Sequence, residues 1–172
     1  LVAAISLNAL LVVYLAVYPA FLGWLMVRLF PDCNRIRLLL VSPAVWTLLE
    51  WARSWVLTGF PWLSLGYSQV DSPLAGLAPF SGIYGLSWAV AFTSSLLVYA
   101  YLGGKRRALM HVLPAFLALW GSSWAMSFID WSRSYGEPQQ VALIQGNVAQ
   151  EFKWDADYSE ETLERYLEMS RE

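Results

Sequence analysis

The sequence predicts a multi-pass α-helical membrane bundle of about four spans, followed by the first strand and helix of an α/β domain. Three stretches contain no Asp, Glu, Lys or Arg, namely residues 1–27, 72–104 and 108–129. About twenty apolar residues suffice to cross the hydrocarbon of a bilayer. Only 14% of the 172 residues are charged, against roughly 25% in a soluble domain. From residue 130 onward the sequence returns to ordinary charged composition.

The first two predicted spans precede the first strong helix-breaking stretch. Residues 1–29 form span one, with Pro19 as the expected kink. This segment lacks a charged start and a small-residue cleavage site, so we do not expect a signal peptide. Residues 28–35 contain Pro and Asn and predict a polar turn. Span two covers residues 36–57.

Residues 58–80 are too rich in Gly, Pro and Ser for a straight span, yet too apolar for an ordinary loop. Irregular backbone at membrane depth is tolerated only where protein or a wet cavity surrounds it. We therefore expect a broken, re-entrant or interfacial outer segment here. Spans three and four cover residues 80–101 and 108–129. Residues 1–129 are thus assigned to transmembrane helices with a broken outer segment at 58–80.

Basic residues predict the orientation of the bundle. Before residue 130 there are seven Lys and Arg and three acidic residues, and the basic ones cluster in two loops. Arg28, Arg35 and Arg37 flank the first loop, and residues 105–107 are all basic, whereas the second loop has none. Arg53, near the outer end, opposes the pattern. By the positive-inside rule, the first and third loops are cytoplasmic and the C-terminal part faces outward.

The charged tail predicts the opening of an α/β domain. Residues 130–138 form a linker, and residues 139–172 begin the domain. Val141–Ile144 is a short apolar run that is typical of a buried strand. Residues 157–160 have the spacing of a capping box, and Leu163, Tyr166 and Leu167 then recur at helical spacing.

Glu50 and Arg53 lie one helical turn apart, at or near membrane depth. Ionisable groups there are costly and usually paired. One interpretation is a mutual ion pair that orients the outer end of the helix. The other is a functional role, either a contact with a lipid headgroup or a proton site.

Few other residues suggest chemistry. His111 has no partner at metal-ligand spacing, and we interpret it as an interfacial histidine. Cys33 is the single cysteine and is interpreted as an ordinary loop residue. The sequence shows no nucleophile–base arrangement, phosphate loop or metal site. We expect no cofactor, no metal and no nucleic-acid partner.

Two motifs add a resemblance to a known family. Residues 55–69 read WVLTGFPWLSLGYSQ, and residues 141–155 read VALIQGNVAQEFKWD. The first resembles the membrane-domain signature of apolipoprotein N-acyltransferases. The second resembles the start of their nitrilase-like domain. The resemblance covers the later membrane helices and the first strand and helix of that domain. The family's N-terminal helices and most of its catalytic domain would lie outside this chain.

The resemblance implies a bacterial inner-membrane enzyme with an αββα nitrilase-like domain in the periplasm. Such enzymes move an acyl chain from a phospholipid, typically phosphatidylethanolamine, to the α-amino group of the diacylglyceryl-modified N-terminal cysteine of a lipoprotein. The reaction proceeds through a thioester, with a Cys nucleophile, a Glu base and a Lys at the oxyanion. All three residues would fall beyond Glu172, so no catalytic residue is assigned here.

Two features of the family's site do match positions in this sequence. Trp154 matches a tryptophan that lines the acyl-binding cleft. Gly59, Phe60, Pro61 and Trp62 match the outer segment beneath that cleft, where lipid tails pass. The simpler interpretation is that Trp62 anchors the membrane interface and Trp154 packs its domain.

Two other classes of protein stay open. The first is a non-enzymatic transport or binding module in which Glu50, Arg53 and the broken segment 58–80 form a solute path. The sequence shows no inverted repeat and no second broken segment in its support. The second is a membrane anchor for a soluble domain with no catalytic role.

Overall fold

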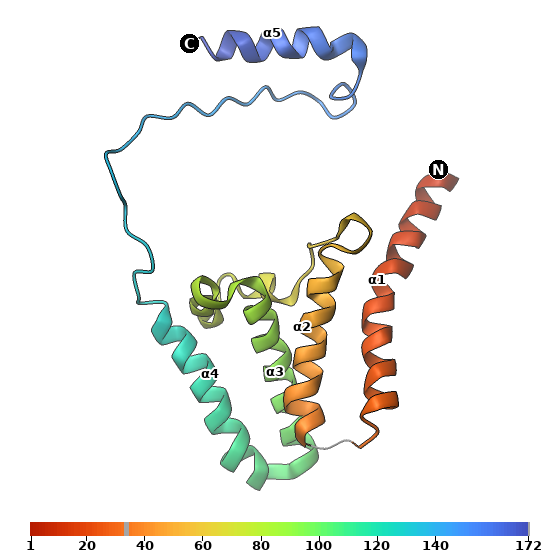
Figure 1. The fold of residues 1–172 in the computed structure, drawn as a ribbon, viewed down its shortest axis with the longest axis vertical. Coiled ribbons are helices and arrows are strands. Elements are labelled where there is room, and N and C mark those ends of the chain that lie inside the picture. The colour runs from red at the N-terminus through yellow and green to blue at the C-terminus, as the bar shows by residue number, and fades with distance from the viewer. Residues whose placement is uncertain (33–34, 172) are drawn as a thin grey trace. The chain divides into compact units, whose positions relative to one another are not determined.

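The computed structural model describes residues 1–32 and 35–171. The chain divides into two compact units, Leu1–Ser132 and Arg133–Glu172. The first unit contains helices α1 to α4, and the second contains helix α5 (Figure 1). Cys33 lies outside the described residues.

The first unit is a bundle of helices that run up and down. Its helices are α1 (Val2–Leu29), α2 (Ser42–Arg53), α3 (Ala78–Arg107) and α4 (Leu113–Met126). Short π-helical turns, Arg37–Val41 and Ala108–Val112, lead into α2 and α4. Helix α2 packs against both α1 and α3, and α4 packs mainly against the segment before α3. The ends of α1 and α3 therefore lie at the same end of the bundle as the starts of α2 and α4 (Figure 1).

The outer surfaces of these helices are apolar. In α1 only Met26 is buried, while large side chains such as Leu7, Val13 and Trp24 are exposed. Exposed apolar surface of this extent is unfavourable in water, and it suits the acyl chains of a bilayer. The prediction of a helical membrane bundle is confirmed.

The expected number of spans is not reproduced in the described residues. Three segments are long and apolar enough to cross a membrane, namely Val2–Leu29, Pro73–Arg107 and Leu109–Met126. The segment expected as span two is α-helical only as far as Arg53 and is not among them. Two charged residues in its last turn reduce its apolar character, and the chain leaves the helix soon after them.

Two glycines change the direction of the chain within α3. Gly82 and Gly104 have φ of 62° and 71°, in the region that residues with a Cβ rarely adopt. The break at Gly104 precedes the basic residues 105–107 and turns the chain toward α4. The break at Gly82 separates the main part of α3 from its first turn.

The packed core of the first unit lies where the segment before α3 meets α3 and α4. Leu74, Leu86 and Ala89 are buried together, with Leu119 and Trp120 of α4 against them. The Trp120 indole Nε1 donates a hydrogen bond to Thr93 Oγ1 at 3.1 Å and links α4 to α3. Tertiary packing is therefore densest beside the broken segment.

The second unit contains a short 3₁₀ turn, Ala156–Tyr158, and α5 (Ser159–Met169). The helix agrees with the sequence, but the described residues of this unit form no strand, so the predicted strand Val141–Ile144 is absent from this structure. A strand requires a neighbouring strand for its backbone groups, and the unit offers none. The predicted cap is also displaced, because Asp155 accepts the bond from the Asp157 backbone N–H.

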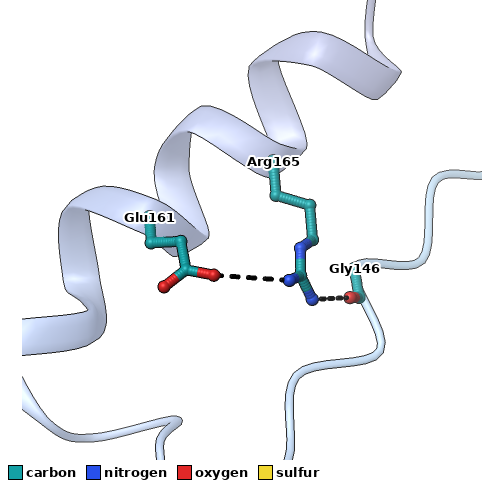
Figure 2. Close-up of polar contacts among 3 residues, drawn as sticks. All are labelled: Gly146, Glu161 and Arg165. Carbon is teal, nitrogen blue, oxygen red and sulfur yellow. Dashed lines mark hydrogen bonds and ion pairs between the residues drawn. The ribbon is translucent and has the colours of Figure 1, made fainter.

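Arg165 connects α5 to the irregular segment before it. Its Nη1 donates to the Gly146 carbonyl at 3.2 Å, and its Nη2 lies 3.5 Å from Glu161 Oε1 (Figure 2). The Tyr166 ring also lies so close to Gly146 that a Cβ there would come within 2.7 Å of it. These contacts hold the loop around Gly146 against the helix.

Candidate functional site

Residues 54–77 join α2 to α3 and are called the connector. They include most of the broken segment predicted at 58–80. The connector contains three 3₁₀ turns, Val56–Thr58, Leu65–Gln69 and Pro73–Leu77. Four of its residues have φ between 52° and 85°, and three of them are not glycine; the four are Leu57, Thr58, Gly59 and Leu63. Backbone of this kind persists only where the surroundings fix it.

Glu50 supports the middle of the connector from the last turn of α2. Its side chain is only 3% exposed. Its Oε1 accepts two hydrogen bonds, from the Trp46 indole Nε1 and from the Leu65 backbone N–H, both at 2.9 Å. A carboxylate buried without partners would be very costly. The two hydrogen bonds to Oε1 offset part of the cost of burying Glu50. The second oxygen, Oε2, is buried and has no protein partner.

Arg53 supports the first half of the connector. It is 8% exposed, and its Nη2 donates to the Trp62 carbonyl at 3.3 Å. Its own carbonyl accepts from the Phe60 backbone N–H at 2.8 Å. Its Nε is buried without a protein partner.

The expected ion pair between Glu50 and Arg53 is not formed. Within the described residues an ion pair joins Glu161 and Arg165, and none joins Glu50 to Arg53. The two buried side chains of α2 instead turn to different backbone groups of the connector. The reason is that a non-helical segment leaves peptide groups without partners, and a buried peptide group must be satisfied.

Two serines hold the second half of the connector. Ser87 of α3 is fully buried, and its Oγ accepts from the Gly66 backbone N–H at 2.9 Å. Ser123 of α4 is also fully buried, and its Oγ donates to the Pro73 carbonyl at 2.8 Å.

Helix α1 contacts the first half of the connector through Tyr14, whose hydroxyl donates a hydrogen bond to the Val56 carbonyl at 3.0 Å.

Two glycines allow the connector to approach other backbone closely. A Cβ on Gly59 would lie 2.0 Å from the Ser54 carbonyl oxygen, and φ there is 85°. A Cβ on Gly76 would lie 1.9 Å from the Ser123 carbonyl oxygen. Any larger residue at these two positions would displace backbone, so the sequence requires glycine at both.

The residues expected to form the outer part of the site lie together on this fixed backbone. Gly59 and Phe60 are half-buried, and Pro61 and Trp62 are exposed, Trp62 to 64%. The rings of Phe60 and Trp62 meet edge to face, with centroids 5.4 Å apart. The arrangement presents aromatic surface outward from a rigid support, which is suited to binding apolar chains and offers no nucleophile.

An apolar groove of about 370 Å³ begins at the connector and continues between the helices. Leu65 lies at the connector, and Trp46, Leu22 and Val98 line the groove from α2, α1 and α3. Trp46 is also the residue that donates to Glu50. The groove and the supported connector therefore share a wall.

Trp154 lies in the second unit and is 84% exposed. The Lys153 ammonium is 6.0 Å from the centre of its ring. Its assignment to an acyl cleft, like that of Trp62, stays a prediction.

The membrane unit matches a described family. The profile of the apolipoprotein N-acyltransferase N-terminal domain matches residues 1–96, which include α1, α2, the connector and most of α3 up to Leu96. The chain belongs to the apolipoprotein N-acyltransferase family. The family resemblance drawn from residues 55–69 is thereby confirmed.

Curated apolipoprotein N-acyltransferases also align along nearly the whole chain. The protein of Methylococcus capsulatus is 40% identical over 169 residues, covering 98% of this chain and 33% of its own length. That of Vibrio cholerae is 41% identical over 172 residues, covering 99% and 33%. That of Chromobacterium violaceum is 44% identical over 164 residues, covering 95% and 31%. The chain thus spans about a third of the length of these relatives.

Sequence reasoning singled out residues 59–62 together with Glu50 and Arg53, but it missed other side chains that hold the connector. Trp46, Ser87 and Ser123 looked like ordinary residues of apolar helices. A signal was present for the two serines, since a polar residue in a membrane helix often bonds to a neighbouring segment. Nothing in the local pattern indicated which segment each would meet.

Proposed function

We propose that this chain is part of an enzyme that transfers an acyl chain from a phospholipid to the α-amino group of the lipidated N-terminal cysteine of a lipoprotein. The family and the names of the relatives support this activity. The observation that supports it best in the structure is the fixed connector, in which Glu50 and Arg53 hold the backbone beneath exposed Trp62.

The connector is proposed as the surface along which acyl chains reach the reaction site. A diacyl substrate needs an apolar surface that opens sideways into the bilayer, because its tails remain in hydrocarbon. Phe60 and Trp62 supply that surface, with Gly59 and Pro61 fixing its backbone. Trp154, in the second unit, is proposed to line an acyl-binding cleft. Phosphatidylethanolamine is the proposed donor and a diacylglyceryl lipoprotein the acceptor.

The chemical groups are expected outside this chain. A thioester mechanism requires a thiolate nucleophile, a base to generate it and a donor for the oxyanion. In the family a Cys, a Glu and a Lys supply them, and no residue of this chain matches those positions. The role proposed for the described residues is to bind and orient the lipid.

The proposed setting is the bacterial inner membrane, with α2 as a fourth crossing and the second unit in the periplasm. The basic residues support this orientation, because those at the end of α1, the start of α2 and residues 105–107 gather at one end of the bundle. A reporter fused after Arg107 should be cytoplasmic, and one fused after Gln140 should be exported. The reverse pattern would refute the orientation.

Acyl transfer by the full-length enzyme tests the role of the connector. Trp62→Ala should lower kcat/KM for the lipid donor about tenfold, since it removes one large apolar contact. Trp124→Ala is the matched control. Trp124 is 57% exposed and also meets a phenylalanine edge to face, but it lies on α4, away from residues 59–62. Trp154→Ala should resemble Trp62→Ala. Equal turnover in all three variants would leave the tryptophans as structural residues only.

The structure gives no support to the transport alternative. A solute path needs polar groups that face it, whereas Glu50 and Arg53 are buried and contact the connector backbone. Transport of a solute by the purified protein, with no acyl transfer, would reverse this conclusion.

A further inference from the structure

An apolar cavity of about 290 Å³ lies at the end of the bundle opposite the connector. It is formed where α2 and α4 begin and α3 approaches its end. Leu39, Phe92 and Leu96 form apolar walls, and Arg35, Tyr99 and His111 are its polar lining residues. The cavity therefore combines an apolar interior with cationic and hydrogen-bonding groups.

A second cavity, of about 310 Å³, shares His111 with the first. Its lining adds Arg106 and Arg107. Among the described residues that line the two cavities, none is acidic. The four basic residues that line the two cavities, here called the basic rim, are Arg35, Arg106, Arg107 and His111.

Arg107 is held in a defined position on the basic rim. Its guanidinium carbon lies 4.8 Å from the centre of the Tyr99 ring, which lines the first cavity. Its side chain also passes directly over Gly103, where a Cβ would come within 2.0 Å of Arg107 Cδ. A cation placed against an aromatic face is stabilised there. The arginine thus links the two cavities through Tyr99.

We propose that this pair of cavities binds an anionic phospholipid, with the phosphate at the basic rim and an acyl chain in the apolar cavity. Charge complementarity supports an anionic ligand, and basic pockets between membrane helices are suited to such headgroups. The apolar walls favour a lipid over a free anion. Ile36 and Leu40 are exposed beside the first cavity, so the surface around it is also apolar.

This site is separate from the one proposed for acyl transfer. The helical segment from Arg37 to Arg53 spans 17 residues, which corresponds to about 25 Å at 1.5 Å per residue. The connector and the basic rim lie at opposite ends of that segment. A lipid at the rim therefore occupies the other leaflet, and the proposal does not depend on the enzyme's activity.

Native mass spectrometry of the full-length protein, with phosphatidylglycerol or phosphatidylethanolamine added in neutral detergent, tests the proposal. The protein should retain more phosphatidylglycerol than phosphatidylethanolamine. Arg35→Gln and Arg107→Gln should each weaken that binding about fivefold, the value of one cation near an anionic lipid. Lys105→Gln is the matched control, because it makes the same charge change in the same turn but lines neither cavity.

Three results would overturn the proposal. Equal losses in the Lys105, Arg107 and Arg35 variants would indicate diffuse attraction instead of a site. Equal retention of both lipids by the unsubstituted protein would remove the anionic requirement. Displacement of the lipid by excess inorganic phosphate would indicate a site for free anions.

A second variant tests the apolar part without changing charge. Ala115 lines the first cavity and is half-buried, so Ala115→Phe should fill it and lower phosphatidylglycerol retention. Ala118→Phe, on the exposed surface of the same helix, is its control. Unchanged retention in Ala115→Phe would exclude an acyl chain from the cavity. Acyl transfer should remain measurable in both variants.

Discussion

The connector and the irregular segment of residues 139–149 are both non-helical, yet their backbones are supported very differently. Side chains from each of the four helices of its unit form hydrogen bonds with the connector backbone, among them the buried Glu50, Ser87 and Ser123. In residues 139–149, the side-chain support is the exposed Arg165, which donates to Gly146. Gly146 is the one residue of the second unit that is buried among those described.

The difference shows what fixes irregular backbone. In an apolar surrounding, a peptide group without a partner has no water to bind, so neighbouring helices must supply polar side chains. In the exposed second unit, water can satisfy the same groups, and little selects one conformation. Glu50, Ser87 and Ser123 are therefore best understood as partners of the connector.

The largest effect should come from Glu50→Ala. It leaves the Leu65 N–H and the Trp46 indole without their acceptor, which should lower the free energy of unfolding by about 2–4 kcal/mol. Thermal unfolding of the full-length protein in detergent measures the loss. Glu50→Gln keeps a carbonyl oxygen for these donors and should lose less than half as much. Equal losses would show that the charge matters more than the hydrogen bonds.

Gly59→Ala should have the next largest effect. The added Cβ meets the Ser54 carbonyl at a position with positive φ, and the cost should be about 2 kcal/mol. Gly136 has nearly the same φ, 83°, but a Cβ there meets nothing within 4 Å. Gly136→Ala should therefore change the unfolding temperature far less. A similar shift in both variants would mean that backbone conformation alone sets the cost.

Ser87→Ala should destabilise the connector by about 1–2 kcal/mol, because the Gly66 N–H loses its acceptor in a buried position. Amide hydrogen exchange at Gly66 should quicken, while exchange within α1 should not change. Ser94→Ala is the control, since Ser94 is exposed and its hydroxyl bonds to the Val90 carbonyl of its own helix. Unchanged exchange at Gly66 would contradict the role of Ser87.

Arg165→Gln should have the smallest effect. Arg165 and Glu161 are about half and two-thirds exposed, and an exposed pair of this kind contributes at most about 0.5 kcal/mol. Exchange should increase only near Gly146, and the unfolding temperature of the membrane unit should stay the same. A large loss of overall stability would mean that the second unit is more firmly packed than its exposure indicates.

The sequence by itself determined the membrane character of residues 1–129, most helix positions and the family. Charge-free runs and turn residues are local properties, and α1, α3, α4 and α5 follow them closely. The length of α2 was the exception. In its last turn, Glu50 and Arg53 form hydrogen bonds with the connector backbone. The hydropathy of residues 36–57 does not indicate that the helix ends there.

Only the tertiary structure decided what the buried polar residues do. Glu50 and Arg53 are spaced for an ion pair. The connector, however, places peptide groups that lack backbone partners within reach of both side chains, and each side chain forms a hydrogen bond with one of those groups instead. The predicted strand at Val141–Ile144 was absent for the converse reason, since its backbone found no partner strand. Both outcomes depend on groups far away in the sequence, because a hydrogen bond forms with whatever the fold places beside it.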